Sequence, residues 1–451
     1  MAGALDILVM VGQLILALSI LVGLHEFGHL LAAKIFGMRV EQFSIGFPPK
    51  VFGFKYGETV YSIGAIPLGG YVKIAGMVDE SLDLKKLSEE PKPWEFRAKP
   101  AWQRLIVMLG GVFINVITGI VIFIALTYSY GESYISREEV NKHGIVAYDL
   151  GLKIGFKTGD KLIKINGEDF TKFNEVRSPD LLLEDNSYYT VERNNQLIDL
   201  PIPSNFIEYF SERDANYRFI EPKAPFAIAR LVKGSGAESG GLLPGDYIIS
   251  IEGEPVHYFH ELQPVLSKYA GKVALVLVSR QDDLKNENSL RLEKELMIPI
   301  SEDSTMGFYP SLLLKETRLQ FSLAEAIPVG TKKAFSVVWV NIKAFGKMFK
   351  GELSPTKSLR GPLGIMKTFG VNWDWFRFWT LTGLISMVLA FMNLLPIPAL
   401  DGGHVMFLSY EIISGRKPAD KFMEYAQKAG MVILLVLMVF ILFNDIIQEF
   451  F

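Results

Sequence analysis

Long apolar runs near both ends of the chain constrain its fold more than any other feature. Two of them exceed 20 residues without a charged residue: 24 residues at Leu105–Tyr128 and 23 at Phe378–Leu400. A third lies in the first 36 residues, and a fourth, at 429–443, reaches a full span if it extends over 423–447. A helix needs about 20 apolar residues to cross the hydrocarbon core of a bilayer. The sequence therefore predicts a polytopic α-helical membrane protein with four transmembrane helices.

Composition excludes several classes of protein. The formal net charge of -3 gives no electrostatic basis for binding nucleic acid. The 451 residues include no cysteine, which rules out disulfides, thiolate catalysis and cysteine-ligated zinc. The first apolar run has no basic region before it, because residues 1–33 contain no Lys or Arg. We therefore expect it to be a retained span and not a signal peptide.

Lysine and arginine residues are concentrated in two of the connecting segments. Residues 34–104 contain 11 of them, and the loop after the third span contains Arg416, Lys417, Lys421 and Lys428. Residues 445–451, beyond the fourth span, contain none. By the positive-inside rule, residues 34–104 and 401–428 are cytoplasmic, while both termini and the 129–375 region lie outside.

Two segments of the middle region repeat each other. GFKTGDKLIKINGEDF, from Gly155, and GLLPGDYIISIEGEPV, from Gly241, share seven of their first 14 residues. Such a repeat indicates two copies of one domain. The pattern resembles the circularly permuted bacterial PDZ domain, a mixed α+β fold that binds extended peptides at an open sheet edge. A folded spacer or steric gate is the alternative, and the sequence leaves both open.

The first apolar run contains the motif HEFGH, which places His25, Glu26 and His29 inside a predicted membrane span. HExxH is a zinc-protease motif. On a helix, residues four apart stack on one face, so the two imidazoles can share a metal ion. Glu26 lies beside them as a candidate general base. Ionisable residues inside a membrane are costly and usually functional, and we therefore expect one bound Zn²⁺ per chain.

A catalytic zinc usually has three protein ligands, and the third must come from elsewhere. Glu41 is close in sequence but is expected to lie beyond the end of the helix. The segment FMNLLPIPALDGGH, residues 391–404, offers Asp401 at the cytoplasmic end of the third span, at a depth similar to that of the histidines. Pro396 and Pro398 break the helix before it. His404 is an alternative ligand that lies further toward water.

Three further residues accompany these candidates within the spans. Asn393 lies inside the third span, where its amide could hold a substrate backbone or bond a neighbouring helix. Gly111 and Asn115, in GGVFIN of the second span, form a small-xxx-polar pair suited to close packing beside the metal helix. Plain helix packing is the stronger interpretation for these two, and they are also counted with Asn393 among the candidate substrate-binding residues.

The set HExxH, GxxxN, NxxPxPxLDGG and a tandem PDZ insert, taken together, resembles the site-2 protease family of intramembrane zinc metalloproteases over essentially the whole chain. The resemblance implies that His25, His29 and Asp401 are the zinc ligands and Glu26 the general base. It also implies that Asn393 helps to clamp an unwound substrate.

The same resemblance extends to the segment after the first span. FSIGFPPK at 43–50 and YSIGAIPLGGYVKIAG at 61–76 match a membrane re-entrant β-hairpin whose edge pairs with the substrate, through residues that include Ile66, Gly69 and Gly70. The family often has Gly-Phe-Gly-Pro where this chain has Gly-Phe-Pro-Pro at 46–49. An amphipathic segment at 322–352 predicts a helix on the outer membrane surface or one packed on the PDZ pair.

These predictions divide the chain into ten segments. They are the first transmembrane helix (1–36), the β-hairpin region (37–78), a cytoplasmic loop (79–104), the second transmembrane helix (105–128), two PDZ domains (129–218 and 219–306), a segment with the amphipathic helix (307–376), the third transmembrane helix (377–400), a cytoplasmic loop (401–427) and the fourth transmembrane helix (428–447).

The resemblance implies regulated intramembrane proteolysis in the bacterial inner membrane. The substrates would be single-span membrane proteins already trimmed by another protease, namely the anti-sigma factor of the envelope stress response and remnant signal peptides. The partners are thus these substrates and the lipid bilayer, with no nucleic acid. A membrane-anchored PDZ scaffold without catalysis and a zinc-dependent transporter are the rival classes, and four spans without an inverted repeat disfavour the transporter.

Overall fold

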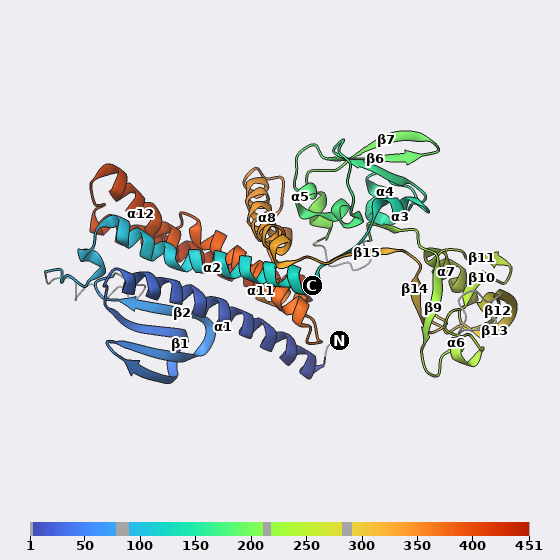
Figure 1. Ribbon diagram of the computed structural model, residues 1–451, viewed down its shortest axis with the longest axis horizontal. Coiled ribbons are helices and arrows are strands. Elements are labelled where there is room, and N and C mark those ends of the chain that lie inside the picture. The colour runs from blue at the N-terminus through green and yellow to red at the C-terminus, as the bar shows by residue number, and fades with distance from the viewer. Residues whose placement is uncertain (1–2, 78–89, 211–217, 282–290, 451) are drawn as a thin grey trace. The chain divides into compact units, whose positions relative to one another are not determined.

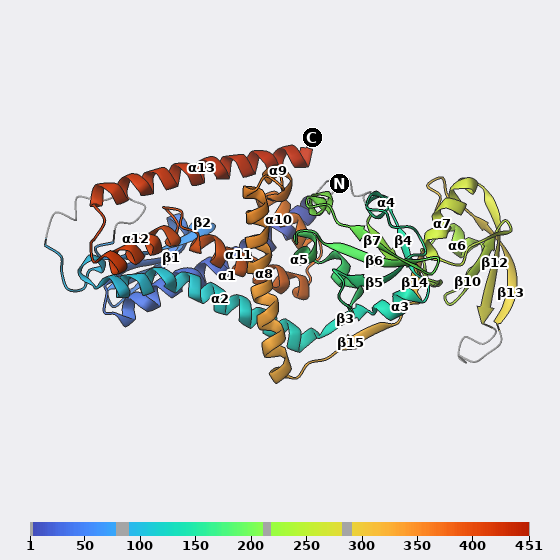
Figure 2. The ribbon, with the colours of Figure 1, turned by 90° about the horizontal axis from the view of Figure 1, so that it is seen from above.

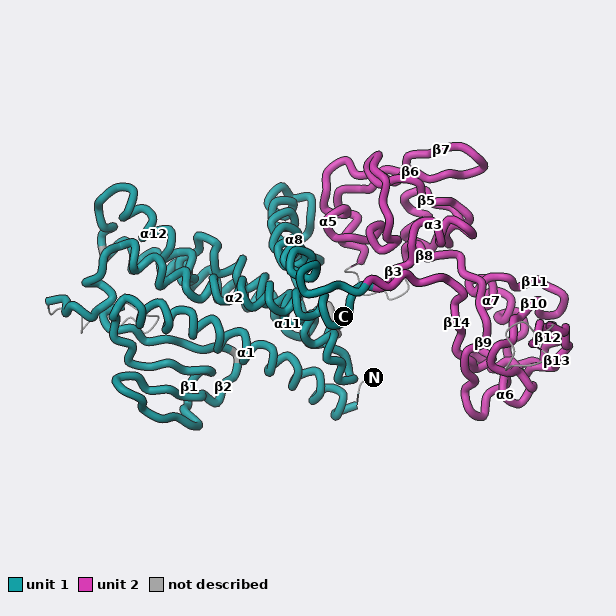
Figure 3. Tube along the Cα trace, viewed as in Figure 1, with its two compact units in different colours: residues 1–132, 320–451 teal, residues 133–319 magenta. Residues whose placement is uncertain are grey.

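The computed structural model describes residues 3–77, 90–210, 218–281 and 291–450. Residues 79–89 of the predicted 79–104 loop, including Lys85 and Lys86, lie outside these residues, as do short parts of both predicted PDZ domains. The chain forms two compact units, residues 1–132 with 320–451 and residues 133–319, which Figure 3 shows in different colours. Each unit is described by itself.

Four long apolar helices form the frame of the first unit (Figures 1 and 2). Within the described residues, they are the helices long and apolar enough to cross a membrane. Their bounds are α1 (Ala4–Ile35), α2 (Ala101–Tyr130), α11 (Trp375–Leu394) and α13 (Asp420–Phe450). Their number agrees with the four spans predicted from the apolar runs.

Two glycines allow α1 and α2 to cross at backbone contact. A Cβ built on Gly28 would lie 2.2 Å from the carbonyl oxygen of Gly110, and one built on Gly110 would lie 2.6 Å from that of Gly28. In lipid, where apolar burial gives no net driving force between helices, small residues let backbones approach and gain van der Waals contact. This crossing brings the HExxH face of α1 against α2.

A sheet of two long, bent strands, β1 (Val40–Tyr56) and β2 (Thr59–Ile74), packs against α1. The first part of β1 pairs with β2 on both of its sides, because Ile45 lies opposite both Ile63 and Gly70. The two strands, in the region predicted as a β-hairpin, therefore form an antiparallel pair that folds back on itself. Its last part, which ends at Ile74, is left as an edge.

The third apolar run does not continue as one helix. Helix α11 ends at Leu394, Pro396 and Pro398 follow in non-helical backbone, and α12 (Asp401–Ser414) then begins. The two glycines after Asp401 make this turn possible, since a Cβ on Gly402 would lie 2.1 Å from the carbonyl oxygen of Leu395. Asp401 is therefore the first residue of a separate helix, at its N-terminal end.

The remaining helices of this unit are α8 (Leu323–Phe349), α9 (Pro355–Ser358) and α10 (Pro362–Phe369), with a short 3-10 turn at Phe96–Ala98. Helix α8 runs across the long helices (Figure 2) and packs on α2 and α11. Three of its four buried residues, Ala326, Gly330 and Ala334, are small, and a Cβ on Gly330 would lie 2.6 Å from backbone atoms of Ile124. Its opposite face exposes large apolar side chains, among them Phe335 and Trp339.

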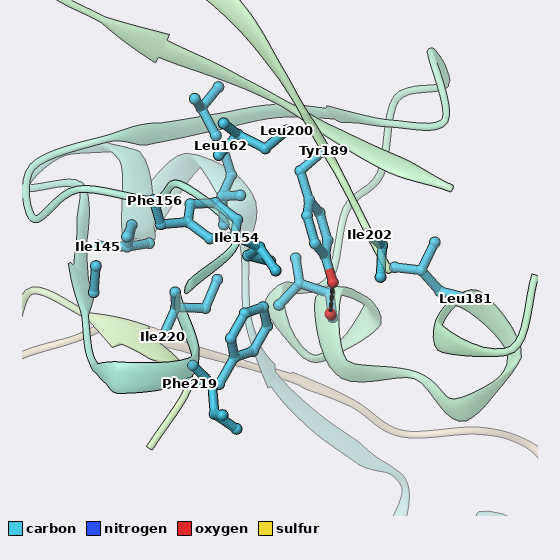
Figure 4. Close-up of a cluster of buried hydrophobic side chains, with 14 of the residues drawn as sticks. Ile145, Ile154, Phe156, Leu162, Leu181, Tyr189, Leu200, Ile202, Phe219 and Ile220 are labelled. Atoms are coloured by element: carbon cyan, nitrogen blue, oxygen red, sulfur yellow. Dashed lines mark hydrogen bonds between the residues drawn. The ribbon is translucent and has the colours of Figure 1, made fainter. Parts of the chain in front are cut away.

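The second unit contains two hydrophobic cores, and the first is built on the earlier copy of the sequence repeat. Figure 4 shows that core, where the buried Tyr189 hydroxyl donates a 2.6 Å hydrogen bond to the carbonyl of Val176. Its strands are β4 (Ile145–Ala147) paired with β8 (Ile220–Pro222), and β5 (Lys161–Ile165), β6 (Tyr188–Arg193) and β7 (Gln196–Pro201) in one sheet; its helices are α3 (Arg137–Asn141), α4 (Asp149–Lys153) and α5 (Pro179–Leu182).

The second core uses the later copy of the repeat. Strands β9 (Phe226–Leu231) and β14 (Phe308–Leu312) pair, and a four-stranded sheet has the order β11 (Glu254–Pro255), β10 (Tyr247–Ile251), β12 (Val273–Gln281), β13 (Arg291–Pro299). Helices α6 (Gly236–Ser239) and α7 (Phe259–Leu266) complete it, and β3 (Glu132–Ile135) pairs with β15 (Glu316–Leu319) where the chain enters and leaves the unit.

The Gly-Asp turn makes the same contacts in both copies. Arg193 donates two hydrogen bonds to the buried carboxylate of Asp160 and one to the carbonyl of Gly155. In the second copy Arg280 makes the equivalent three bonds to Asp246 and Gly241. A bidentate pair of this kind fixes the planes of the guanidinium and the carboxylate relative to each other. It therefore holds the turn at the start of each repeat to a strand about 30 residues later in the chain.

We predict that Gly28→Ala destabilises the first unit by about 1–3 kcal/mol, because the new methyl group meets backbone atoms of α2 that no rotamer change can move. Thermal unfolding of the purified protein in detergent measures the change. Gly12→Ala, in the same helix, is the matched control, because a Cβ there meets nothing within 4 Å. Equal unfolding temperatures for the two variants would show that α1 and α2 do not depend on this crossing.

Candidate metal centre

The three predicted metal-binding side chains meet at one point between α1 and α12. Nε2 of His25 and Nε2 of His29 lie 3.2 Å apart. Oδ2 of Asp401 lies 3.1 Å from the first nitrogen and 3.4 Å from the second. Within the described part of the chain, no other group of three histidine or acidic side chains brings its ligand atoms together in this way.

This arrangement fits a small tetrahedral cation. Ligand atoms at 2.0–2.1 Å from a tetrahedral zinc ion are separated by about 3.3 Å, close to the three separations in the structure. Oδ2 of Asp401 is buried and makes no hydrogen bond within the described residues, although both ring nitrogens are near. A buried carboxylate oxygen without a donor is costly. The donor set, two imidazoles and one carboxylate, is one that zinc accepts.

Helix α2 supports both imidazoles from behind. Nδ1 of His29 lies 2.8 Å from the main-chain oxygen of Val107, and Nδ1 of His25 lies 3.2 Å from the side-chain amide of Asn115. Gly111 lies between these two contacts. A Cβ on Gly111 would lie 2.5 Å from both Cε1 of His25 and Nε2 of His29. Only glycine therefore leaves room for the two rings at this position.

A cavity of about 470 Å³ opens beside the three ligand atoms. Glu26, the predicted general base, lines it together with the ligands. The amide nitrogen of Asn393 lies 3.4 Å from Nε2 of His25. The cavity thus combines a cation site, a carboxylate and a nearby amide.

The residues predicted to contact substrate do not all lie at this cavity. Gly70 lines it, and a Cβ there would lie 3.1 Å from Cγ of Glu26. Ile66 and Gly69 do not line it, and Gly69 instead lies against the ring of Phe47. Gly111 and Asn115 touch the imidazoles and not the open space.

The two alternative ligands are not part of the converging group. His404 lines the cavity, but its Nε2 lies 3.0 Å from the side-chain amide of Gln427 in α13. Glu41 lies at the start of β1 and does not line the cavity.

Several wall residues were not among the predicted ones. The edge of β2 supplies Tyr71, Val72 and Lys73, and α13 supplies Gln427 and Lys428. The β2 residues follow directly on Gly70 and lie within the 61–76 segment predicted to pair with substrate, so the sequence did carry a signal for them. The α13 residues and the Val107 carbonyl carry no sequence signal, since only the packing of the helices brings them here.

Comparison with known proteins gives a consistent result. The profile of peptidase family M50 matches residues 13–437. The regulator of sigma E protease of Haemophilus influenzae is 28% identical over 464 residues, covering 97% of this chain and 98% of the relative. The regulator of sigma-E protease RseP of Salmonella typhimurium is 27% identical over 461 residues, covering 98% and 99%.

We predict that Gly111→Ala lowers metal affinity at least about tenfold, because the methyl group displaces both imidazoles from their common point. Metal content after dialysis against graded chelator concentrations measures the effect. Gly119→Ala in the same helix is the control, because a Cβ there meets mainly the flexible end of Met387. If both variants keep the metal as the wild type does, the two rings do not meet against Gly111.

Proposed function

The chain belongs to peptidase family M50, and from this premise we propose that it is an intramembrane zinc metalloprotease that cleaves a peptide bond within the transmembrane segment of single-span membrane proteins. The observation that carries the proposal is the convergence of His25, His29 and Asp401 beside Glu26, with both histidines and Glu26 on a helix long and apolar enough to span a bilayer.

His25, His29 and Asp401 hold one zinc ion in this proposal. When bound, zinc acts as a Lewis acid that activates water and polarises the scissile carbonyl. Glu26 takes the proton of the attacking water and later passes it to the leaving amine. Its place in the wall of the same cavity as the ligands supports this role.

The substrate must be unwound before it can be cleaved, because a helix in lipid satisfies all of its backbone hydrogen bonds internally. We assign the replacement of those bonds to the edge of β2, a re-entrant sheet at the depth of the metal. Gly70 and its neighbours Tyr71–Lys73 line the cavity there. The amide of Asn393 supplies a further donor and acceptor close to His25.

The lysine and arginine distribution supports a topology in which both termini and the 133–319 unit lie outside the cytoplasm, in the periplasm of a bacterial inner membrane. The metal ligands then lie toward the cytoplasmic side of their spans. Helix α8, with small residues against α2 and large apolar residues on its exposed face, lies along the outer membrane surface.

We assign the two repeated modules of residues 133–319 to the PDZ fold, acting as a steric filter and not as a pair of peptide readers. The reason is a proline at the same position of each outer strand. Ile145 pairs with Pro222 in the first module, and its equivalent Ile228 pairs with Pro310 in the second. Both isoleucines make the same two backbone bonds to the Gly-Asp turn of their repeat.

These prolines face away from the partner strands, toward the edge where a peptide would add. In the first module Phe219 and Lys223 bond the partner strand through their backbone, so Ile220 and Pro222 face outward. Proline has no N–H to donate, and proline is one of the devices that blunt an edge strand. Arg177 also occupies the outward carbonyl of Ile220. Strand addition is therefore disfavoured.

The physiological substrates follow from the same premise. Two relatives along the whole chain are named for regulation of sigma E. We propose that this chain acts likewise on a membrane-bound anti-sigma factor, and on remnant signal peptides, after another protease has removed their outer domains.

Glu26→Gln tests the catalytic role. We expect the variant to keep one zinc per chain, since the ligands are untouched, while cleavage of a single-span reporter falls by about 10²–10⁴-fold. Zinc analysis and gel-based cleavage of the same preparations measure both. If the wild type binds no metal, or if the variant cleaves as fast as the wild type, the protease proposal is wrong. The protein would then be a membrane-anchored scaffold or a transporter.

The filter makes a separate prediction about substrate size. A series of reporters with outer domains of increasing size should be cut by the wild type only when that domain is small. A variant with residues 133–319 replaced by a short flexible linker should cut the whole series. If the wild type and the shortened variant show the same size dependence, the modules are not a filter.

A further inference from the structure

Both histidines of the metal centre are supported through Nδ1 by one helix, but by different chemical groups. His29 faces a main-chain carbonyl of α2, that of Val107, at 2.8 Å. His25 faces a side chain, with the amide nitrogen Nδ2 of Asn115 at 3.2 Å from its Nδ1. Val107, Gly111 and Asn115 follow one another at four-residue spacing, so they form one stripe of α2 that faces the two rings.

The chemistry of imidazole fixes what each support must do. A neutral imidazole has one N–H and one lone pair. Both rings present Nε2 to Asp401, and Nε2 binds a cation only if its lone pair is free. The proton must then be on Nδ1, which requires an acceptor beside it. The Val107 carbonyl is such an acceptor, and a carbonyl cannot act as a donor.

The side chain of Asn115 can accept or donate, because its oxygen and nitrogen are alike in shape and are assigned from their neighbours. With the amide nitrogen toward His25, Nδ1 would carry the lone pair and Nε2 the proton, which prevents metal binding. With Oδ1 toward His25 the ring has the required tautomer. In the structure Nδ2 is the atom toward His25, and Oδ1 of the fully buried Asn115 has no partner within the described residues, so exchanging the two amide atoms gives Oδ1 a partner.

We propose that Asn115 is a positioning residue for His25: its side-chain oxygen accepts a hydrogen bond from Nδ1–H, sets the tautomer and directs Nε2 at the metal. This inference rests on the proposed zinc site and gives the GxxxN motif a role beyond helix packing. Gly111 makes the space for the rings, and Asn115, one turn later, orients the ring that has no carbonyl behind it. The amide belongs to the metal site and does not contact substrate.

The location of Asn115 suits this role. Its own main-chain oxygen accepts a 2.8 Å hydrogen bond from the buried hydroxyl of Ser386 in α11, which fixes this part of α2 against a second spanning helix. Partners of metal-bound histidines are usually carboxylates, carbonyls or water, and their loss typically weakens metal binding 10–100-fold. An amide oxygen serves the same purpose without a second charge in lipid.

The test compares zinc affinity of full-length variants in detergent, by competition with a chromogenic chelator. We expect Asn115→Leu to bind zinc about 10–100-fold more weakly, because leucine is nearly the same size but cannot accept a hydrogen bond. Asn115→Asp, which keeps an acceptor, should bind within a few-fold of the wild type or more tightly. A packing role predicts the reverse order, since leucine suits a buried site and a carboxylate does not.

Gln13→Leu is the matched control. Gln13 is also a fully buried amide in a spanning helix, with one atom bonded to a main-chain carbonyl, that of Gly370, and one without a partner within the described residues. Its loss should leave zinc affinity unchanged. If Asn115→Leu does not fold, Asn115→Ala takes its place in the comparison.

The outcomes separate this inference from the function on which it rests. Wild-type zinc affinity in Asn115→Leu, or equal weakening by Leu and Asp, overturns the positioning role and leaves the protease intact. A wild type that binds no zinc overturns the proposed function itself. The visible spectrum of the Co²⁺-substituted protein gives a second readout, because an altered ligand set at His25 changes it in the Leu variant and not in the Asp variant.

Discussion

The rest of the first unit depends on one contact. Two imidazole nitrogens and one carboxylate oxygen lie together inside a bundle of apolar helices. Oδ2 of Asp401 is buried without a hydrogen bond within the described residues, and the nitrogens of His25 and His29 lie 3.1 Å and 3.4 Å from it. In a low-dielectric interior such a group is costly unless a cation completes it. Much of the neighbouring backbone geometry serves to bring these atoms together.

That backbone geometry depends on glycine and proline residues. Gly28 and Gly110 lack side chains at the crossing of α1 and α2, and Gly111 lacks one beneath the rings. Pro396 and Pro398 cannot continue α11, so the chain turns and starts α12 at Asp401. Each of these features costs helix stability by itself, and each is compensated by a contact that only the assembled unit can make.

Most of the candidate metal site could be predicted from the sequence. Its residues are either close together in the sequence or have a membrane depth that can be estimated from the length of an uncharged run. The i, i+4 spacing of His25 and His29 places them on one helical face whatever surrounds them. Asp401 could be predicted from its distance along an uncharged run. The Val107 carbonyl could not, because every residue has one and only helix packing selects it.

In the β1–β2 sheet and in the two repeated modules, strand pairings between residues distant in the sequence could not be predicted either. That Ile45 lies between Ile63 and Gly70 follows from a strand that bends back, and alternation of residues does not report this. The equivalence of Pro222 and Pro310 appears only once their partner strands are known, more than 70 residues away in each module. Ile66 and Gly69 lie away from the cavity for a related reason, since register decided which β2 residues reach it.

The most direct measurement uses the absence of cysteine from the natural chain. Zinc X-ray absorption of Asp401→Cys should show one sulfur neighbour at about 2.3 Å in addition to imidazole nitrogens at about 2.0–2.1 Å, while the wild type shows nitrogen and oxygen neighbours alone. A sulfur signal would establish that position 401 binds the same ion as the two histidines. Zinc bound by the variant with no sulfur neighbour would contradict it.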